Sequence, residues 1–172
     1  MPSFRDIPKL TSQGSYQINV PWMYLEKTIQ EYLDIGLELN PDFQRGHVWT
    51  EAQQIAYVEF ILRGGKTART IYFNNPSWGC QTNKNYTSFV CVDGLQRLTA
   101  VRRFLNNEIP AFGHYLNEYT DRLPLFVDFI FNVNDLQTKR EVLVWYIEMN
   151  SAGTEHTSDE INRVKKLLEE EK

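Results

Sequence analysis

Hydrophobic positions follow two periods along this chain, and each period predicts one kind of element. Apolar residues recur at helical spacing over residues 21–36, 50–64, 94–106, 138–149 and 157–168. Apolar residues form short runs or alternate with polar ones over residues 37–45, 69–73, 88–92 and 125–133, which predicts strands or extended segments. Pro41 interrupts the first of these, and residues 109–120 fit neither period. The pattern therefore predicts an α+β fold with a short mixed sheet and about five helices.

The boundaries of the elements carry local signals of their own. Capping boxes, which satisfy the free N–H groups of a first turn, are predicted for Thr50 with Gln53, Thr138 with Glu141 and Thr157 with Glu160. Residues 1–20 are mixed and polar, and they predict an extended N-terminal arm. No repeat or linker divides the rest, so residues 21–172 are expected to form a single domain.

Composition excludes several classes of protein. The chain has 172 residues, of which 42% are hydrophobic and 23% charged, so it is long and apolar enough to fold around its own core. The net charge of −4 argues against a protein that coats nucleic acid through bulk charge. No apolar run approaches the length of a membrane span, and no signal peptide is present. We therefore expect a cytoplasmic protein with no membrane contact.

Cysteine and histidine usage predicts no structural metal site. Cys80 and Cys91 form no Cys-x-x-Cys pair, and His47, His114 and His156 are scattered. The common zinc spacings are thus absent. A reduced chain with small buried thiols is the expectation.

The most informative stretch is Asp93-Gly94-Leu95-Gln96-Arg97, where a predicted strand turns into a helix. The first N–H groups of a helix have no partners within it and carry the positive end of its dipole. Gly94 lets a ligand approach the backbone, and Arg97 adds a cation with a fork that fits phosphate oxygens. These features predict an anion site, most plausibly for phosphate. The simpler alternative is that Asp93 caps the helix and Arg97 forms a surface ion pair.

Three other stretches carry weaker signals. Gln44 and Arg45 precede Trp49, which would either stack on a base or cover the core. Residues 150–154 form a glycine-containing turn between two predicted helices, and such turns either bind anions or merely connect helices. Arg63, Lys66 and Arg69 surround Gly64-Gly65 as a basic cluster that would contact a nucleic-acid backbone or remain a solvated loop.

Taken together, these stretches resemble the N-terminal domain of GmrSD-type modification-dependent restriction enzymes, a family of phage-defence and phage-borne proteins. The match runs from about Leu25 to Leu168. The first family box, P-x-[FY]-Q-R-x-x-V-W, is matched by Pro41, Phe43, Gln44, Arg45, Val48 and Trp49. The second box, D-G-Q-Q-R-L-T-A, is matched from Asp93 to Ala100 except at Leu95. The third, an I-N-x-x-G-T-x-x-[ST] turn, is matched by Asn150, Gly153, Thr154 and Thr157.

The resemblance implies a fold like that of ParB and sulfiredoxin, in which a loop–helix junction holds nucleotide phosphates. It implies binding and hydrolysis of a nucleoside triphosphate (NTP) with Mg²⁺ or Mn²⁺, with Asp93, Arg97 and Arg45 as the catalytic residues. Asp93 would hold the metal ion or its water. The phosphate-binding residues implied by position are Gln44, Arg45, Gly94, Gln96, Arg97, Asn150, Gly153 and Thr154.

Two departures from the family pattern keep three hypotheses open. Leu95 replaces the first glutamine of the second box, and no H-N-H nuclease constellation is present. The first hypothesis is an NTP-hydrolysing or NTP-sensing domain in DNA restriction, anti-restriction or phage DNA processing. The second is a metal-dependent DNA nickase or endonuclease that uses the same pocket. The third is a non-catalytic module that forms a homodimer and binds a nuclease or a host defence protein.

Overall fold

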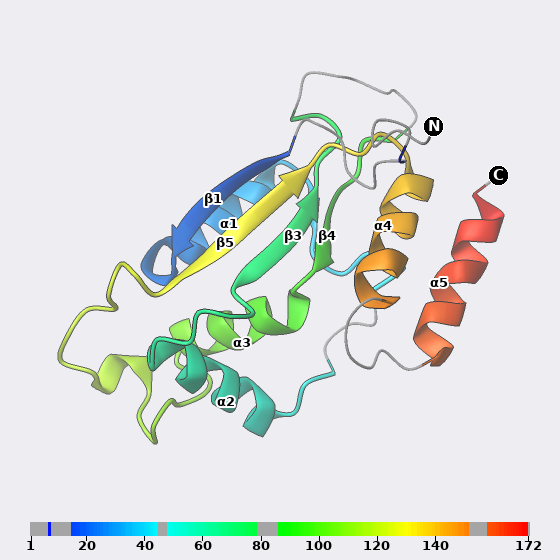
Figure 1. Ribbon diagram of the computed structural model, residues 1–172. Coiled ribbons are helices and arrows are strands. Elements are labelled where there is room, and N and C mark those ends of the chain that lie inside the picture. Colours follow the sequence, from blue (N-terminus) through cyan, green and yellow to red (C-terminus); the bar gives the residue numbers. More distant parts are fainter. Residues whose placement is uncertain (1–6, 8–14, 45–47, 79–85, 152–157, 172) are drawn as a thin grey trace.

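The computed structural model describes residues 7, 15–44, 48–78, 86–151 and 158–171, and it shows one mixed sheet with helices on both faces (Figure 1). The strands are β1 (Tyr16–Pro21), β2 (Leu37–Glu38), β3 (Thr70–Asn74), β4 (Phe89–Asp93) and β5 (Asp128–Asn134). The helices are α1 (Leu25–Asp34), α2 (Glu51–Leu62), α3 (Leu95–Leu105), α4 (Lys139–Ser151) and α5 (Ser158–Glu170), with short 3₁₀ turns η2 (Trp22–Tyr24) and η3 (Leu116–Glu118). The α+β class and the five helices predicted from the sequence are confirmed for the described part of the chain.

The sheet has the strand order β1-β5-β3-β4-β2. β5 pairs antiparallel with β1 and parallel with β3, while β4 pairs antiparallel with β3 and parallel with β2. Because β3 and β4 run in opposite directions, the end of β4 lies beside the start of β3, and Asp93 is opposite Tyr72. This edge of the sheet carries the second sequence box.

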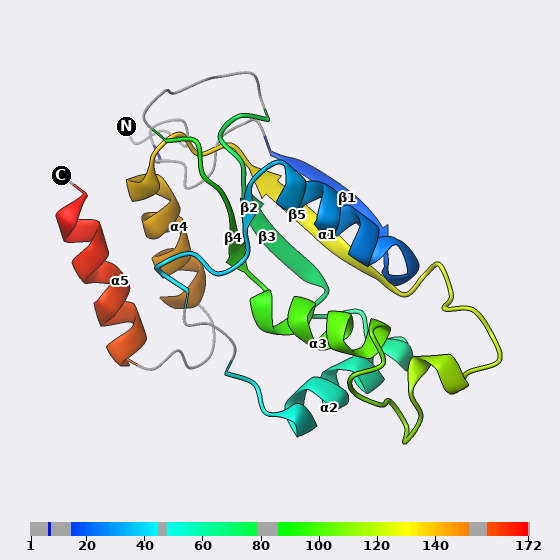
Figure 2. The same ribbon diagram turned by 180° about the vertical axis from the view of Figure 1, so that it is seen from behind.

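Each face of the sheet has its own hydrophobic cluster. The larger cluster joins the inward residues of β3, β4 and β5 to α1, α2 and α3, with Phe73, Phe129 and Phe131 completely buried. The smaller cluster lies on the other face, where Val90 and Val92 of β4 pack beneath α4. Figure 2, seen from behind, shows α1 against the face opposite to the one that α4 covers in Figure 1.

The predicted cap of α2 is confirmed in detail. The Thr50 N–H donates to Gln53 Oε1 at 2.8 Å, and the Gln53 N–H donates to Thr50 Oγ1 at 3.3 Å. The same reciprocal pair joins Thr138 and Glu141 before α4. Thr157, the first residue of the capping box predicted with Glu160, lies outside the described residues.

The N-terminal segment differs from its prediction. Residues 16–21 are not a free arm but the edge strand β1, which pairs with β5 along its whole length. Its alternation of Tyr16, Ile18 and Val20 is a strand signal, which the polar surroundings and the short length of the segment obscure. The sheet therefore begins at Tyr16, before the domain boundary predicted at residue 21.

The last strand also begins later than its alternation predicts. Leu125 is 63% exposed and lies in a turn closed by a hydrogen bond from the Val127 N–H to the Pro124 carbonyl, so it does not share the buried face of β5. Of the segment predicted as extended over residues 37–45, the structure describes residues 37–44, and within these only Leu37–Glu38 forms a strand. Within the described residues, no helix is both long enough and apolar enough to cross a membrane.

Candidate functional site

The turn between β4 and α3 is built around Gly94. Its φ of +103° lies in the left-handed region, and a Cβ atom there would lie 2.6 Å from Ile71 Cδ1 and 3.3 Å from Ile71 Cα. The position therefore requires glycine both for its backbone conformation and for space. Gly94 is the N-cap of this eleven-residue helix and, being glycine, has no side chain that could cap the first turn.

Asp93 and Arg97 form an ion pair across this turn. Arg97 Nη2 donates to Asp93 Oδ2, and the side chains are 18% and 35% exposed for Arg97 and Asp93 respectively. Asp93 therefore does not cap the helix, and the ion pair of the simpler alternative does form. The pair holds the guanidinium beside the first turn of α3, and the other guanidinium N–H groups form no hydrogen bond with a described residue.

The replacement of glutamine by Leu95 has a structural explanation. Leu95 is 8% exposed and packs in the larger hydrophobic cluster. Its side chain therefore faces the core, not the solvent side of the turn. This inward side chain makes its contacts in the core.

Two glutamines brace the first and second boxes against each other. Gln44 Nε2 donates to the carbonyls of Cys91 at 3.1 Å and Val92 at 2.7 Å. From the other side, Gln96 Oε1 accepts hydrogen bonds from the N–H groups of Val48 at 2.9 Å and Trp49 at 3.0 Å. The sequence predicts phosphate contacts for both glutamines, and the structure gives them a bracing role that it did not predict.

Trp49 belongs to the packing of this region. Its ring meets that of Tyr57 edge to face with 5.4 Å between centroids, and it packs against the larger cluster while partly buried. Of the two roles that the sequence left open, covering the core is the one observed. Burial raises the pKa of Tyr57, and the charges of Arg97 and Arg69 oppose that rise, so both guanidinium groups lie within electrostatic reach of the phenol.

Arg163 of α5 is a contributor that sequence reasoning missed. Its Nη2 donates to the carbonyl of Phe43 at 3.1 Å and to that of Gln44 at 2.7 Å. These bonds fix the first box from the side opposite to β4. In the sequence, Arg163 is one charged residue on the polar face of a predicted helix, and no local signal distinguishes it from its neighbours.

The third box is only partly described. Asn150 is 9% exposed, and its Nδ2 donates to the Tyr146 carbonyl one turn earlier at 2.7 Å. This bond ties its amide nitrogen to its own helix. The other residues of the predicted site, Arg45, Gly153 and Thr154, lie outside the described residues.

The predicted basic cluster is divided by the structure. Arg69 Nη1 pairs with Asp128 Oδ1, and Asp128 Oδ2 accepts a hydrogen bond from Asn19 Nδ2 at 2.6 Å. The Asp128 carboxylate therefore joins β5 to β1 and to the residue that precedes β3. Arg63 and Lys66 are exposed. A cavity of about 280 Å³ beside them is lined by Lys66, Arg69 and Asp128 among others. Of the two alternatives given for this cluster, a solvated loop does not describe Arg69, whose charge is paired and whose side chain is 20% exposed.

The side chains that the structure describes offer few ligands for a metal ion. No group of three or more histidine, cysteine, aspartate or glutamate side chains that could hold a metal ion is found in the part of the chain that the structure describes. Asp93 offers a single carboxylate, one oxygen of which is bonded to Arg97. This suits an ion such as Mg²⁺, which is often held by one carboxylate together with substrate phosphates. Cys91 is unsuited to such a role because it is completely buried and burial raises the pKa of its thiol.

Comparisons with known proteins found no family model, no curated protein and no solved structure that matches this chain. The resemblance to the GmrSD-type family and the ParB-like identity of the fold therefore stay predictions from the sequence.

Proposed function

We propose that this protein binds a nucleoside triphosphate at the start of α3 and hydrolyses it. The observation that carries the proposal is the combination at one turn of a helix N-terminus, an N-cap position that requires glycine, and an arginine held in place by Asp93. Backbone N–H groups and a guanidinium fork are the groups that proteins use to hold phosphate oxygens. The proposal also rests on the resemblance of this stretch to the second family box.

Catalysis at such a site is mainly electrostatic. Arg97 donates hydrogen bonds to the phosphate oxygens and stabilises the charge that develops as the phosphoanhydride bond breaks. Asp93 orients the guanidinium before the substrate arrives, which lowers the cost of reorganisation. A divalent cation, Mg²⁺ or Mn²⁺, would take Asp93 as one ligand and neutralise charge on the phosphates. Arg45 is proposed as a second cation of the pocket on the strength of the first box alone.

The bracing residues give the proposed pocket its rigidity. Gln44, Gln96 and Arg163 join residues 43–44 and 48–49 to β4, α3 and α5 through bonds to backbone atoms. A site held by its surroundings keeps its donors aligned and loses little entropy on binding. We therefore assign these three residues a positioning role in the proposed reaction.

The experiment that tests this proposal is phosphate release from ATP, GTP, CTP and UTP with Mg²⁺ or Mn²⁺. We expect release by the wild type and a fall of about 100-fold or more for Arg97→Ala. Arg97→Lys, which keeps the charge without the planar fork, is expected to be intermediate. Arg140→Ala is the matched control, because Arg140 is exposed on α4 and bonds only the Leu168 carbonyl. Equal release by the wild type and Arg97→Ala would remove the site from this helix.

A second candidate function is cleavage of a DNA phosphodiester at the same pocket. The observation in its favour is that Lys66 and Arg69 line one cavity just before β3, the strand whose Tyr72 lies opposite Asp93. A polynucleotide would extend from the site onto these cations. Supercoiled plasmid with Mn²⁺ tests this function: we expect relaxation by the wild type and slower relaxation by Lys66→Ala. Plasmid that stays supercoiled would argue against it.

Binding without hydrolysis remains the third hypothesis. Saturable nucleotide binding with no phosphate release and no plasmid nicking would favour a module that acts on a nuclease or a host defence protein. The same Arg97→Ala variant would then lose affinity in an equilibrium binding measurement.

A further inference from the structure

Exposed apolar side chains gather at the end of the molecule away from α4 and α5. The segment that joins α3 to β5 contributes Phe112, Tyr115, Tyr119, Leu125 and Phe126, which are 39% to 71% exposed. Figure 1 shows this segment at the opposite corner of the molecule from the C-terminal helices. We call the surface formed by these five side chains the distal surface. Large apolar patches of this kind mark interaction sites more often than scattered single residues do.

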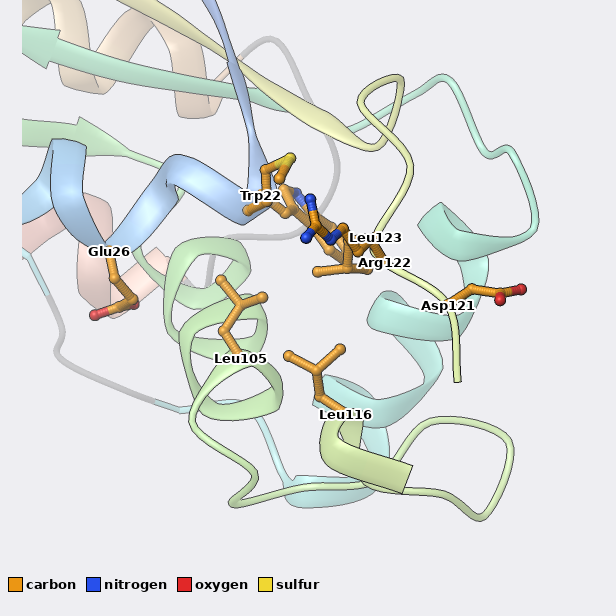
Figure 3. Close-up of a pocket in the computed structure, with 8 residues that line it drawn as sticks. Trp22, Glu26, Leu105, Leu116, Asp121, Arg122 and Leu123 are labelled. Carbon is orange, nitrogen blue, oxygen red and sulfur yellow. The ribbon is translucent and has the colours of Figure 1, made fainter. Parts of the chain in front are cut away.

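Two cavities lie side by side in this region. One, of about 400 Å³, is lined by Trp22, Met23, Glu26 and Leu105, and the other, of about 270 Å³, by Leu62, Phe104, Phe112, Tyr119 and Pro124. Both are also lined by Leu116 and by residues 121–123. The two cavities are therefore the two sides of one apolar groove, and Figure 3 shows the first of them.

A strap formed by residues 120–123 crosses this groove. No hydrogen bond joins the strap to any other described residue. Leu123, partly buried, packs against the larger hydrophobic cluster. A backbone segment held in this way has little to keep it in place beyond the apolar side chain beneath it.

The strap also carries two adjacent opposite charges. Asp121 and Arg122 are exposed, and neither forms an ion pair with a described residue. Glu26, which lines the first cavity together with Asp121 and Arg122, is paired with Arg102. Figure 3 shows the Arg122 side chain extending toward Trp22 and the Asp121 carboxylate pointing away from it. The two charges thus lie on either side of the strap.

A projecting pair of apolar residues follows the strap directly. Leu125 is 63% exposed and Phe126 is 71% exposed, the highest value among the large apolar side chains described. Because only Pro124 separates them from the strap, the projection and the groove belong to one surface. An apolar projection and an apolar groove on the same surface are complementary shapes.

We propose that the distal surface is a homodimer interface in which a second copy of this chain docks about a two-fold axis. In such an interface each contact occurs twice with the partners exchanged. Leu125 and Phe126 of one copy enter the groove of the other, and Arg122 of each copy pairs with Asp121 of the other. The argument for a second copy is charge complementarity: neighbouring unpaired charges of opposite sign match the same surface rotated by 180°.

The test is sedimentation velocity as a function of protein concentration, with charge reversals in the strap. The wild type is expected to form dimers. Asp121→Arg and Arg122→Asp each place like charges opposite one another and should raise the dissociation constant by about tenfold or more. The double variant Asp121→Arg/Arg122→Asp restores opposite charges and should dimerise as the wild type does. A 1:1 mixture of the two single variants should form a heterodimer, because each repels itself but complements the other.

Three outcomes would overturn the proposal. A wild type that stays monomeric up to about 1 mM would show that no dimer of meaningful affinity exists. A wild-type dimer that neither single reversal weakens would place the interface elsewhere on the molecule. A double variant as weak as the single ones would show that Asp121 and Arg122 do not pair across the axis. Lys165→Asp, a reversal of equal size at an exposed position on α5, is the matched control and should leave dimerisation unchanged.

The interface and the proposed catalytic site are tested separately. All the strap substitutions are at exposed positions without hydrogen bonds, so circular dichroism melts should show native stability. The interface does not depend on the proposed nucleotide hydrolysis, and loss of either in these experiments leaves the other intact.

Discussion

The β4–α3 turn and the strap differ in how the chain holds them. At the turn, polar side chains of three separate segments bond to backbone atoms: Gln44 to Cys91 and Val92, Gln96 to Val48 and Trp49, and Arg163 to Phe43 and Gln44. At the strap, no hydrogen bond reaches any other described residue. The turn is therefore held by hydrogen bonds from several segments of the chain, whereas the strap is held mainly by the packing of Leu123.

The largest expected effect is at Gly94. Gly94→Ala forces a Cβ against Ile71 at a φ of +103°, and we expect a loss of about 2 to 4 kcal/mol in the free energy of unfolding. Gly36→Ala is the matched control, since Gly36 has a φ of +95° but nothing within 4 Å of the added carbon. It should lose about 1 kcal/mol, from backbone conformation alone. Urea unfolding of both variants measures the difference, and equal losses would mean that space at Gly94 is not limiting.

The next largest effect is expected from the loss of the hydrogen bonds that Gln96 accepts. Gln96→Ala leaves the N–H groups of Val48 and Trp49 without their acceptor, and we expect a loss of about 1 to 2 kcal/mol. Thr120→Ala in the strap, where no hydrogen bond is lost, should change the free energy of unfolding by less than about 0.5 kcal/mol. Urea unfolding followed by tryptophan fluorescence measures both. A strap substitution as costly as Gln96→Ala would contradict the contrast between the two regions.

A smaller effect, which changes sign with pH, is expected at Tyr57. Its hydroxyl donates to the Ala68 carbonyl at 2.8 Å, so Tyr57→Phe should cost about 1 kcal/mol at pH 7. Burial raises the pKa of Tyr57 in the folded chain above 10.0, the ordinary value for a tyrosine. The stability that this phenol contributes is therefore complete below pH 10 and is lost as the pH rises, by about 1.4 kcal/mol per pH unit.

Because phenylalanine does not ionise, Tyr57→Phe should become more stable than the wild type above about pH 11. Chemical unfolding at several pH values from 7 to about 11 checks this reversal. A difference between the two proteins that stays constant with pH would contradict the assignment of Tyr57 as a buried phenol.

The smallest effect is a difference in local stability between α3 and the strap, which amide hydrogen exchange measures. The Leu98 N–H donates to the Gly94 carbonyl at 2.9 Å inside α3, and it should exchange at least about 1,000-fold more slowly than in an unfolded chain. The amides of Asp121, Arg122 and Leu123 form no hydrogen bond with described residues and should exchange at rates close to those of an unfolded chain. Strong protection of the strap amides in dilute protein would show that the strap is held more firmly than its contacts indicate.

Local signals in the sequence predicted the parts of the fold that depend on neighbouring residues. The capping pairs Thr50–Gln53 and Thr138–Glu141 formed as expected, because each joins residues three apart. The junction at Asp93-Gly94 was also found, since an apolar strand followed by Asp-Gly and helical spacing is a local pattern. The α+β class followed from the two periods of hydrophobicity.

The parts that sequence reasoning missed depend on residues far apart in the chain. The pairing of Arg69 with Asp128 and the bonds of Arg163 to the first box appear only once the sheet and α5 are in place. The inward orientation of Leu95 follows from the way α3 packs on β3. Leu125 kept the alternation of β5 in the sequence, but the turn closed at Pro124 removes it from the buried face.

The strand order has a consequence for how the chain is made. β5 lies between β1 and β3, so the strand that joins the two halves of the sheet is also the last strand to leave the ribosome. Asn19 and Asp128, which bond across β1 and β5, are 109 residues apart. At typical rates of translation, β1 waits about 5 to 20 s for its partner. A nascent chain halted before residue 128 would expose an unpaired strand, open to proteases and chaperones.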